Sequence, residues 1–336
     1  MIRYLIRRLL GMVVVVVVVS FLTFALFYIV PGWFNIEVVR YFVPKIPPGP
    51  EGLIALKHRL GFDLPWYEQY WNFLKGLVVG KNIDDGTGQG LVHCSAPCFG
   101  TSFRQKVSVN SLIVDALPVS FSLVVGAAIL WLLGGITVGT ISGTRPGSFF
   151  DRAGMSLSLA AVSLPIFFTG PILLLIFSYK LGWLSDIQYT PITENPLSWA
   201  RNLLLAWVAL AFLFAALYAR LTRANMMEVM GEDYIRTARA KGLPNRTVIL
   251  KHGLRSALTP IVTIFGIDLG TLIGSTVITE KVFNLRGLGT LTIRAVTQQD
   301  LPVILGTTIV AALFVVVANF LVDIGYGIVD PRVSYS

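Results

Sequence analysis

The sequence predicts an all-helical protein that crosses a membrane six times. Hydrophobic residues make up 54% of its 336 residues, charged residues make up 13%, and the mean hydropathy is +0.72. This composition excludes an ordinary soluble domain. The apolar residues also gather into runs that can cross a hydrocarbon core of about 30 Å. The six runs are Leu9–Val30, Val119–Ile141, Ala153–Tyr179, Leu203–Tyr218, Leu258–Ile278 and Val303–Gly325.

The first run follows the short basic stretch Met1–Arg8 and contains seven consecutive valines. A signal peptide begins in a similar way. However, this apolar core is about twice as long as the usual core of a signal peptide, and no small-x-small cleavage site follows it. We therefore expect a retained membrane-spanning helix.

Lysine and arginine are concentrated in the short loops on one side of the predicted spans. That side carries Arg145, Arg152 and eight basic residues from Arg220 to Arg255, in addition to the basic N-terminus. The short loops on the other side carry Lys180, Arg201, Lys281, Arg286 and Arg294. Because basic loops stay inside, both termini and Asn245 are expected in the cytoplasm, and Gln89 outside it. Orientation in the cytoplasmic membrane thus explains the net charge of +9 better than nucleic-acid binding does.

The predicted spans divide the chain into four parts. Residues 1–31 form the cytoplasmic start and the first span, and residues 32–118 form an extracytoplasmic segment. Residues 119–330 form the helical core with the other five spans and a cytoplasmic loop at 222–257, and residues 331–336 form a tail. The segment 32–118 is too long for a simple connection, so we expect it to fold into a structure of its own.

Two motifs in the outer segment resemble binding sites. Gly76–Lys81 is similar to a phosphate-binding loop, but it has too few residues between its glycines, and Asn82 replaces the required Ser or Thr. Cys94 and Cys98 follow His93 and could form half a metal site, but a disulfide is favoured for two cysteines outside the cytoplasm. The three histidines are scattered, so we expect no catalytic site, no cofactor and no metal.

Several residues within the spans are candidates for packing or for a pathway. Glycine recurs every four residues in two spans, which predicts close helix packing in preference to a pore-lining or subunit-contact role. Pro165 and Pro171 interrupt the third span, where freed carbonyl groups could face a translocation path. Asp268 is a carboxylate in an apolar run and is either a proton-coupling group or, as we favour, a hydrogen-bonded structural one. The glycines are Gly135, Gly139 and Gly143 in the second span, and Gly266, Gly270 and Gly274 in the fifth.

The basic stretch Gly231–Pro260 has the features of two short helices joined at a glycine. Glu232 and Asp233 suit a helix start, and Arg239 and Lys241 suit its end. Gly242 fits the position after the helix, and Pro244 can only begin a new element. A second helix is expected from about Asn245 to His252. Without further information, this stretch is either a docking surface or an ordinary basic loop.

The sequence Asp233–Leu243, followed by His252, Leu254–Arg255 and Pro260, resembles the coupling loop of ABC-importer permeases of the dipeptide/oligopeptide branch. The resemblance implies the type I ABC importer permease fold, with a long extracytoplasmic segment between the first two helices. It also implies several partners: a second homologous permease subunit, two cytoplasmic ATP-binding subunits that hydrolyse ATP in its place, and an extracytoplasmic substrate-binding protein. Transport would proceed by alternating access.

Within this resemblance, seven residues are expected at the contact with an ATP-binding subunit. Tyr234, Ala238 and Leu243 would fill its socket, Arg236, Arg239 and Lys241 would contribute orientation, and Gly242 would set the angle between the two helices. The expected cargo is a di- or oligopeptide. Alternatives are nickel chelates or sugars carried by the same family, a secondary transporter driven by an ion gradient through Asp268, and a membrane receptor or scaffold.

Overall fold

The computed structural model describes residues 2–30, 51, 54, 57–58, 63–84, 91–184 and 188–329. The predicted tail 331–336, Gln89 and much of the stretch 32–62 lie outside the described residues. The chain divides into two compact units. One comprises Met1–Leu117 and Arg286–Val317, and the other comprises Pro118–Leu285 and Ala318–Ser336.

The first unit contains the N-terminal span and the described part of the outer segment. Its elements are α1 (Ile2–Phe24) with a π-helical end (Ala25–Ile29), α4 (Trp66–Val79), strands β1 (Lys81–Asp84) and β2 (Leu91–Cys94), the start of α5 (Val109–Thr144), α13 (Leu288–Gln298) and most of α14 (Leu301–Val329). The two strands form an antiparallel hairpin in which Lys81 pairs with Cys94. The core of this unit joins α4, α5, α13 and α14 through residues such as Phe73, Val109 and Leu305.

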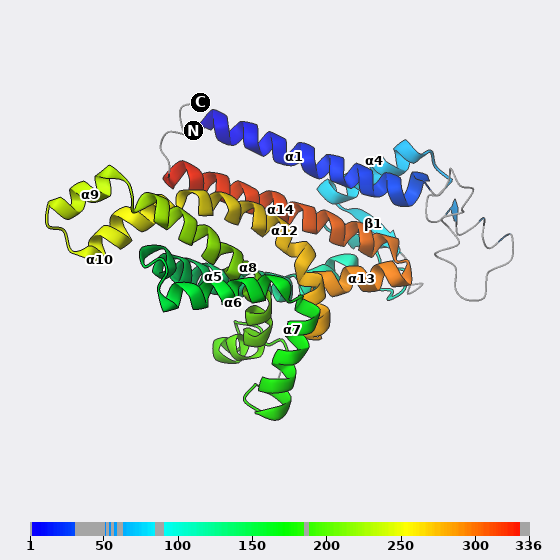
Figure 1. Ribbon diagram of the computed structural model, residues 1–336. Coiled ribbons are helices and arrows are strands. Elements are labelled where there is room, and N and C mark those ends of the chain that lie inside the picture. Colours follow the sequence, from blue (N-terminus) through cyan, green and yellow to red (C-terminus); the bar gives the residue numbers. More distant parts are fainter. Residues whose placement is uncertain are drawn as a thin grey trace. The chain divides into compact units, whose positions relative to one another are not determined.

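The second unit contains the rest of α5 and the helices up to the end of α12. These are α6 (Phe149–Ser163), α7 (Ile166–Leu173) with its π-helical extension η3 (Leu174–Lys180), α8 (Pro196–Val229), α9 (Asp233–Ala240), α10 (Asn245–Thr247), η4 (Val248–Gly253), α11 (Leu254–Ala257) and α12 (Thr259–Val282). Within this unit, α9 and α10 lie beyond the end of α8, away from α7 (Figure 1).

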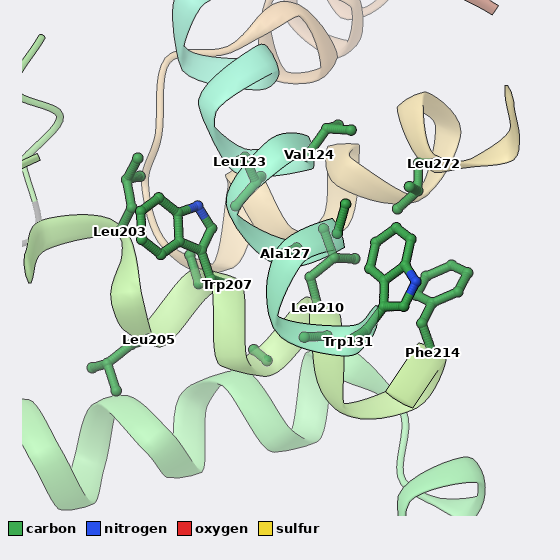
Figure 2. Packing of buried hydrophobic residues seen from close by; sticks show 14 of the residues in the cluster. Leu123, Val124, Ala127, Trp131, Leu203, Leu205, Trp207, Leu210, Phe214 and Leu272 are labelled. Carbon is green, nitrogen blue, oxygen red and sulfur yellow. The ribbon is translucent and has the colours of Figure 1, made fainter. Parts of the chain in front are cut away.

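Aromatic and aliphatic side chains of α5 and α8 form the centre of the second unit. Figure 2 shows Trp131 of α5 beside Phe214 of α8, with Leu272 of α12 nearby. The rings of Trp131 and Phe214 are stacked with their centroids 4.9 Å apart. The indole N–H of Trp207 donates to the backbone oxygen of Ser122 at 3.0 Å, so this buried polar group is satisfied.

The helices agree with the predicted spans. In the part of the chain that the structure describes, four helices are long and apolar enough to cross a membrane: Ile6–Ile29, Val109–Thr144, Pro196–Val229 and Leu301–Phe320. Two bent pairs, Phe149–Ser163 with Ile166–Lys180 and Asn245–Ala257 with Thr259–Gly270, raise the number to six if each pair counts as one span. The first helix of the second pair belongs to the predicted cytoplasmic loop 222–257, so the predicted fifth span corresponds to α12 alone. Apart from the β1–β2 hairpin, the helical, multi-span fold expected for an importer permease is therefore confirmed.

The third predicted span is not a straight rod. α6 and α7 meet at an angle of 108°. Pro165 occupies the junction in an extended conformation, and it cannot donate a backbone hydrogen bond to continue α6. Pro171 lies inside α7, just before the π-helical stretch begins at Leu174.

Candidate functional site

The stretch 231–260 forms the predicted pair of helices around a glycine. α9 runs from Asp233 to Ala240 with Lys241 as its C-cap, and Gly242 follows with a φ of +76°. The amide of Gly242 donates to the Arg239 oxygen at 2.9 Å, and the amide of Leu243 donates to the Ala238 oxygen at 3.3 Å. This pair of bonds is a Schellman motif, which closes the helix with a residue in the left-handed region. The second helix is longer than expected, because α10, η4 and α11 continue to Ala257.

A small apolar cluster holds the two helices together. Ile235 and Ala238 of α9 are buried with Val248 of η4, and Val229 and Met230 pack against them. Ala238 is only 6% exposed. Its methyl group therefore packs inside the segment, which differs from the expectation that it faces a partner. The reason is its spacing: it lies three residues after Ile235, so both side chains project from the same face of α9.

The other predicted contact residues lie on the outside of the segment. Tyr234 is 45% exposed and Leu243 is 39% exposed. Arg239 and Lys241 are also exposed, and Arg236 forms only an exposed contact of 3.4 Å with Asp233. An exposed ion pair of this kind contributes little to stability. These five side chains remain accessible to a partner.

The segment is attached to the end of α8. The side-chain amide of Asn225 donates to the backbone oxygen of Ala257 at 3.2 Å. A Cβ atom at Gly253 would lie 3.0 Å from the sulfur of Met230, so η4 approaches α8 closely. The segment is therefore in direct contact with the end of α8.

An ion pair that the sequence did not predict joins α6 to α8 near the same end. Arg223 Nε lies 2.6 Å from Asp151 Oδ1, and Arg223 Nη2 lies 2.9 Å from Asp151 Oδ2. The amide of Gly147 donates to the same carboxylate at 2.8 Å. The Asp151 side chain is buried and the Arg223 side chain is partly exposed, and the geometry is the bidentate one that suits arginine and a carboxylate. The sequence contained one sign of this ion pair: Asp151 lies just before the third predicted span, and Arg223 follows the fourth.

The glycines of α5 lie directly against the backbone of α8. A Cβ atom at Gly135 would lie 2.6 Å from the Cβ of Tyr218, and one at Gly143 would lie 2.7 Å from the Cβ of Met226. One at Gly139 would lie 2.5 Å from the backbone oxygen of Ala219. Real side chains do not tolerate such distances, so these positions exclude any larger residue. Gly266, Gly270 and Gly274 all belong to α12, where Gly266 is buried.

Asp268 has a hydrogen-bond partner inside the second unit. The Tyr218 hydroxyl group donates to Asp268 Oδ2 at 2.8 Å, which links α8 to α12. A second carboxylate on α12 is more deeply buried: Glu280 is 0% exposed and accepts a hydrogen bond from Ser120 Oγ at 2.6 Å. Both carboxylates thus connect α12 to neighbouring helices, as buried charged groups must be paired to be tolerated.

The outer segment is held together by a disulfide and by a buried carboxylate. Cys94 at the end of β2 forms a disulfide with Cys98. The stretch Gly76–Lys81, which is similar to a phosphate-binding loop, forms the junction between α4 and β1. Burial at this junction lowers the pKa of the Lys81 ammonium group. Asp300 is 1% exposed and accepts hydrogen bonds from Ser102 Oγ and from the amides of Phe103 and Arg104. Among the described residues, no three metal-ligating side chains gather at one place.

Comparisons with known proteins agree with this architecture. The family described as binding-protein-dependent transport system inner membrane component matches residues 135–335, and the N-terminal family of the same membrane components matches residues 1–124. The chain is similar to a di/tripeptide transport system permease protein of Pseudomonas aeruginosa, with 33% identity over 100% of this chain and 99% of that protein. It is also similar to a putative peptide transport system permease protein of Brucella abortus, with 35% identity over 98% of each chain. A glutathione transport system permease protein of Shigella boydii shares 32% identity over 100% of both chains.

Proposed function

Because the chain belongs to the family of binding-protein-dependent transport system inner membrane components, we propose that it moves short peptides across the cytoplasmic membrane as a permease subunit of an ATP-driven importer. The peptide cargo is supported by the relatives, whose names specify di/tripeptides, peptides and glutathione. The chain itself is a translocation subunit, and ATP is hydrolysed in separate subunits of the transporter. The complete complex would contain a second homologous permease, two cytoplasmic ATP-binding subunits and an extracytoplasmic substrate-binding protein.

The observation that carries the proposal is the structure of the segment 231–260, which we call the coupling segment. It is compact, because Ile235, Ala238 and Val248 form its interior, and it is attached to α8 through Asn225 and Gly253. Its exposed side chains Tyr234 and Leu243 would insert into an ATP-binding subunit, with Arg236, Arg239 and Lys241 at the rim. Closure of the two ATP-binding subunits would then move α8 and the helices packed on it, which is a rigid-body switch between two arrangements.

The Lys and Arg distribution supports an orientation with the coupling segment and both termini in the cytoplasm. Single cysteines at Asn245 and Gln89 test this orientation in sealed cells. A membrane-impermeant maleimide should label the cysteine at position 89 and not the one at position 245. The opposite labelling pattern would exclude a cytoplasmic coupling segment.

Replacement of Gly242 by valine tests the coupling role. A β-branched residue is strained at a φ of +76°, although no atom lies within 4 Å of the position that its Cβ would occupy. Gly242→Val should leave the protein in the membrane and abolish ATP-dependent uptake of a radiolabelled dipeptide. Gly182→Val is the matched control, because Gly182 has a φ of +63° and an equally open surrounding, in the loop after η3. Normal uptake by Gly242→Val would refute the coupling role.

Two other functions can be distinguished with the same uptake assay. A transporter driven by an ion gradient would stop when the proton gradient collapses and would survive ATP depletion. The hydrogen bond from Tyr218 to Asp268 supports a structural role for this carboxylate over proton coupling. Nickel chelates and sugars are alternative cargoes, and competition by each of them against the labelled dipeptide would rank them.

A further inference from the structure

The helix α4 has three distinct faces, and the described residues of the chain cover one of them. The covered face packs on α1 and the core of the first unit through Tyr70, Phe73 and Gly76. The Tyr70 hydroxyl group lies 3.0 Å from Ser20 Oγ, and the rings of Phe24 and Phe73 are 6.4 Å apart. These contacts fix the rotation of α4 about its own axis.

The two remaining faces differ sharply in chemistry. Tyr67, Trp71 and Val78 follow one another at spacings of four and seven residues, so they form one stripe on α4. Their exposed fractions are 56%, 66% and 76%. The third face carries the exposed polar residues Glu68, Asn72 and Lys75, with the exposed apolar Val79 at its C-terminal end. The apolar stripe therefore lies between a covered face and a polar face.

The apolar stripe continues the exposed surface of α1. Only 11% of the α1 span is buried within the chain, compared with 67% of the α8 span. An apolar helix that is this exposed has to face lipid or another membrane helix. The ring of Phe21 on α1 lies 6.5 Å from that of Trp66, which in turn lies 5.8 Å from that of Tyr67. All three rings are partly exposed, so the surface passes from α1 to α4 without interruption.

We infer that α4 is a membrane-interface helix that contacts lipid through Tyr67, Trp71 and Val78. Tryptophan and tyrosine are enriched where membrane meets water, because their rings are apolar and each carries one polar group. Lipid contacts the stripe, and the headgroup region and water contact Glu68, Asn72 and Lys75. The leaflet is the one in which α1 ends, since α4 packs along the C-terminal half of α1.

This anchor also fixes the position of the hairpin that follows it. Gly80 directly joins α4 to β1, and the amide of Cys98 donates to the oxygen of Gly76 at 3.1 Å. The hairpin and the disulfide-closed turn that follows it are therefore tied to a helix that is held at the membrane surface. The inference depends on α1 being a membrane span and is independent of the cargo.

Spin labels at single cysteines test the inference in the full-length protein. The chain's only two cysteines are joined in a disulfide, so they do not compete for the label as long as no reductant is added. The variants are Tyr67→Cys and Trp71→Cys on the stripe, and Asn72→Cys and Lys75→Cys on the polar face. Each labelled protein is placed in nanodiscs of phosphatidylethanolamine and phosphatidylglycerol, and the accessibility of the label to oxygen and to a water-soluble nickel chelate is measured.

We expect labels at positions 67 and 71 to collide more often with oxygen than with the nickel chelate, and labels at positions 72 and 75 to show the reverse. Oxygen concentrates in lipid and the chelate stays in water. The ratio of the two accessibilities therefore shows, for each face of α4, whether it contacts lipid or water. Equal nickel accessibility at all four positions would overturn the inference in favour of a water-exposed helix. Labels at 67 and 71 that are immobilised and shielded from both reagents would overturn it in favour of a protein partner.

Discussion

The contact between α5 and α8 and the coupling segment both depend on glycine, but for different physical reasons. At Gly139, the backbone conformation is helical, and the neighbouring helix leaves no room for a Cβ atom. At Gly242, the space is open, and the left-handed backbone is what disfavours other residues. The first requirement is steric and the second is conformational. The same residue type therefore marks a closed interface in one region and a fixed bend in the other.

This difference bears on how the two regions could work together. The α5–α8 contact is reinforced by the Asp151–Arg223 ion pair between α6 and α8, so α5, α6 and α8 are expected to move as one body. The coupling segment has a small interior and a large exposed surface. A rigid group of helices that is joined to a compact, exposed segment is suited to transmitting force from a partner.

The largest effect is expected from Gly139→Ala in the contact between α5 and α8, where the constraint on glycine is steric. Its Cβ atom would lie 2.5 Å from both the Ala219 oxygen and the Thr222 Cβ, so α5 and α8 would have to separate. Overpacking of this kind costs about 1–3 kcal/mol or more. We expect a clear fall in the thermal unfolding temperature of the detergent-solubilised protein.

Gly134→Ala provides the control for that prediction. A Cβ atom at Gly134 would lie 3.9 Å from its nearest neighbour, the Cβ of Ala215. Both substitutions gain the same helix propensity, about 1 kcal/mol, so the difference between them isolates the close contact. Equal unfolding temperatures for the two variants would show that the α5–α8 contact is looser than these distances indicate.

An intermediate effect is expected from Ala238→Asp in the interior of the coupling segment. The new carboxylate would be buried beside Ile235 and Val248 without a partner, and this arrangement is costly. We expect α9 to separate from η4, faster trypsin cleavage at the segment's basic residues in inside-out vesicles, and loss of bound ATP-binding subunits.

Ala240→Asp introduces the same change at an exposed position of the same helix. It should leave trypsin cleavage close to the wild-type rate. If Ala238→Asp lost the ATP-binding subunits without faster cleavage, Ala238 would contact the partner directly, as the sequence alone had suggested.

The sequence predicted the elements of both regions better than their contacts. Apolar runs located the spans, and Glu232, Gly242 and Pro244 located the bend, because these signals act over a few residues. The spacing of Gly135, Gly139 and Gly143 predicted a smooth stripe but could not identify α8 as the helix that it meets. Periodicity describes one helix at a time, and the identity of the opposing helix depends on the complete packing.

The same limit explains what was missed. The bonds between Asp151 and Arg223, and between Asp300 and Ser102, join residues far apart in the chain. Neither pair has a local pattern that distinguishes it from ordinary charged and polar residues. Pro165 was recognised as an interruption, but the 108° bend at that point depends on how α6 and α7 pack.

The smallest effect, and the sharpest test of the comparison, is expected from a series at Gly242. In the left-handed region, alanine costs about 1–2 kcal/mol, whereas asparagine is tolerated much better. Because no atom lies within 4 Å of the position that a Cβ atom would occupy at Gly242, size should not matter there. Gly242→Asn should therefore retain more ATP-dependent uptake than Gly242→Ala, although asparagine is the larger residue.

At Gly139, where the constraint is steric, Gly139→Asn should instead unfold at a lower temperature than Gly139→Ala. Uptake measured in membranes that contain equal amounts of each variant gives the first order, and thermal unfolding gives the second. If asparagine were more harmful than alanine at both positions, the bend at Gly242 would be sterically enclosed by a partner, and the conformational explanation would fail.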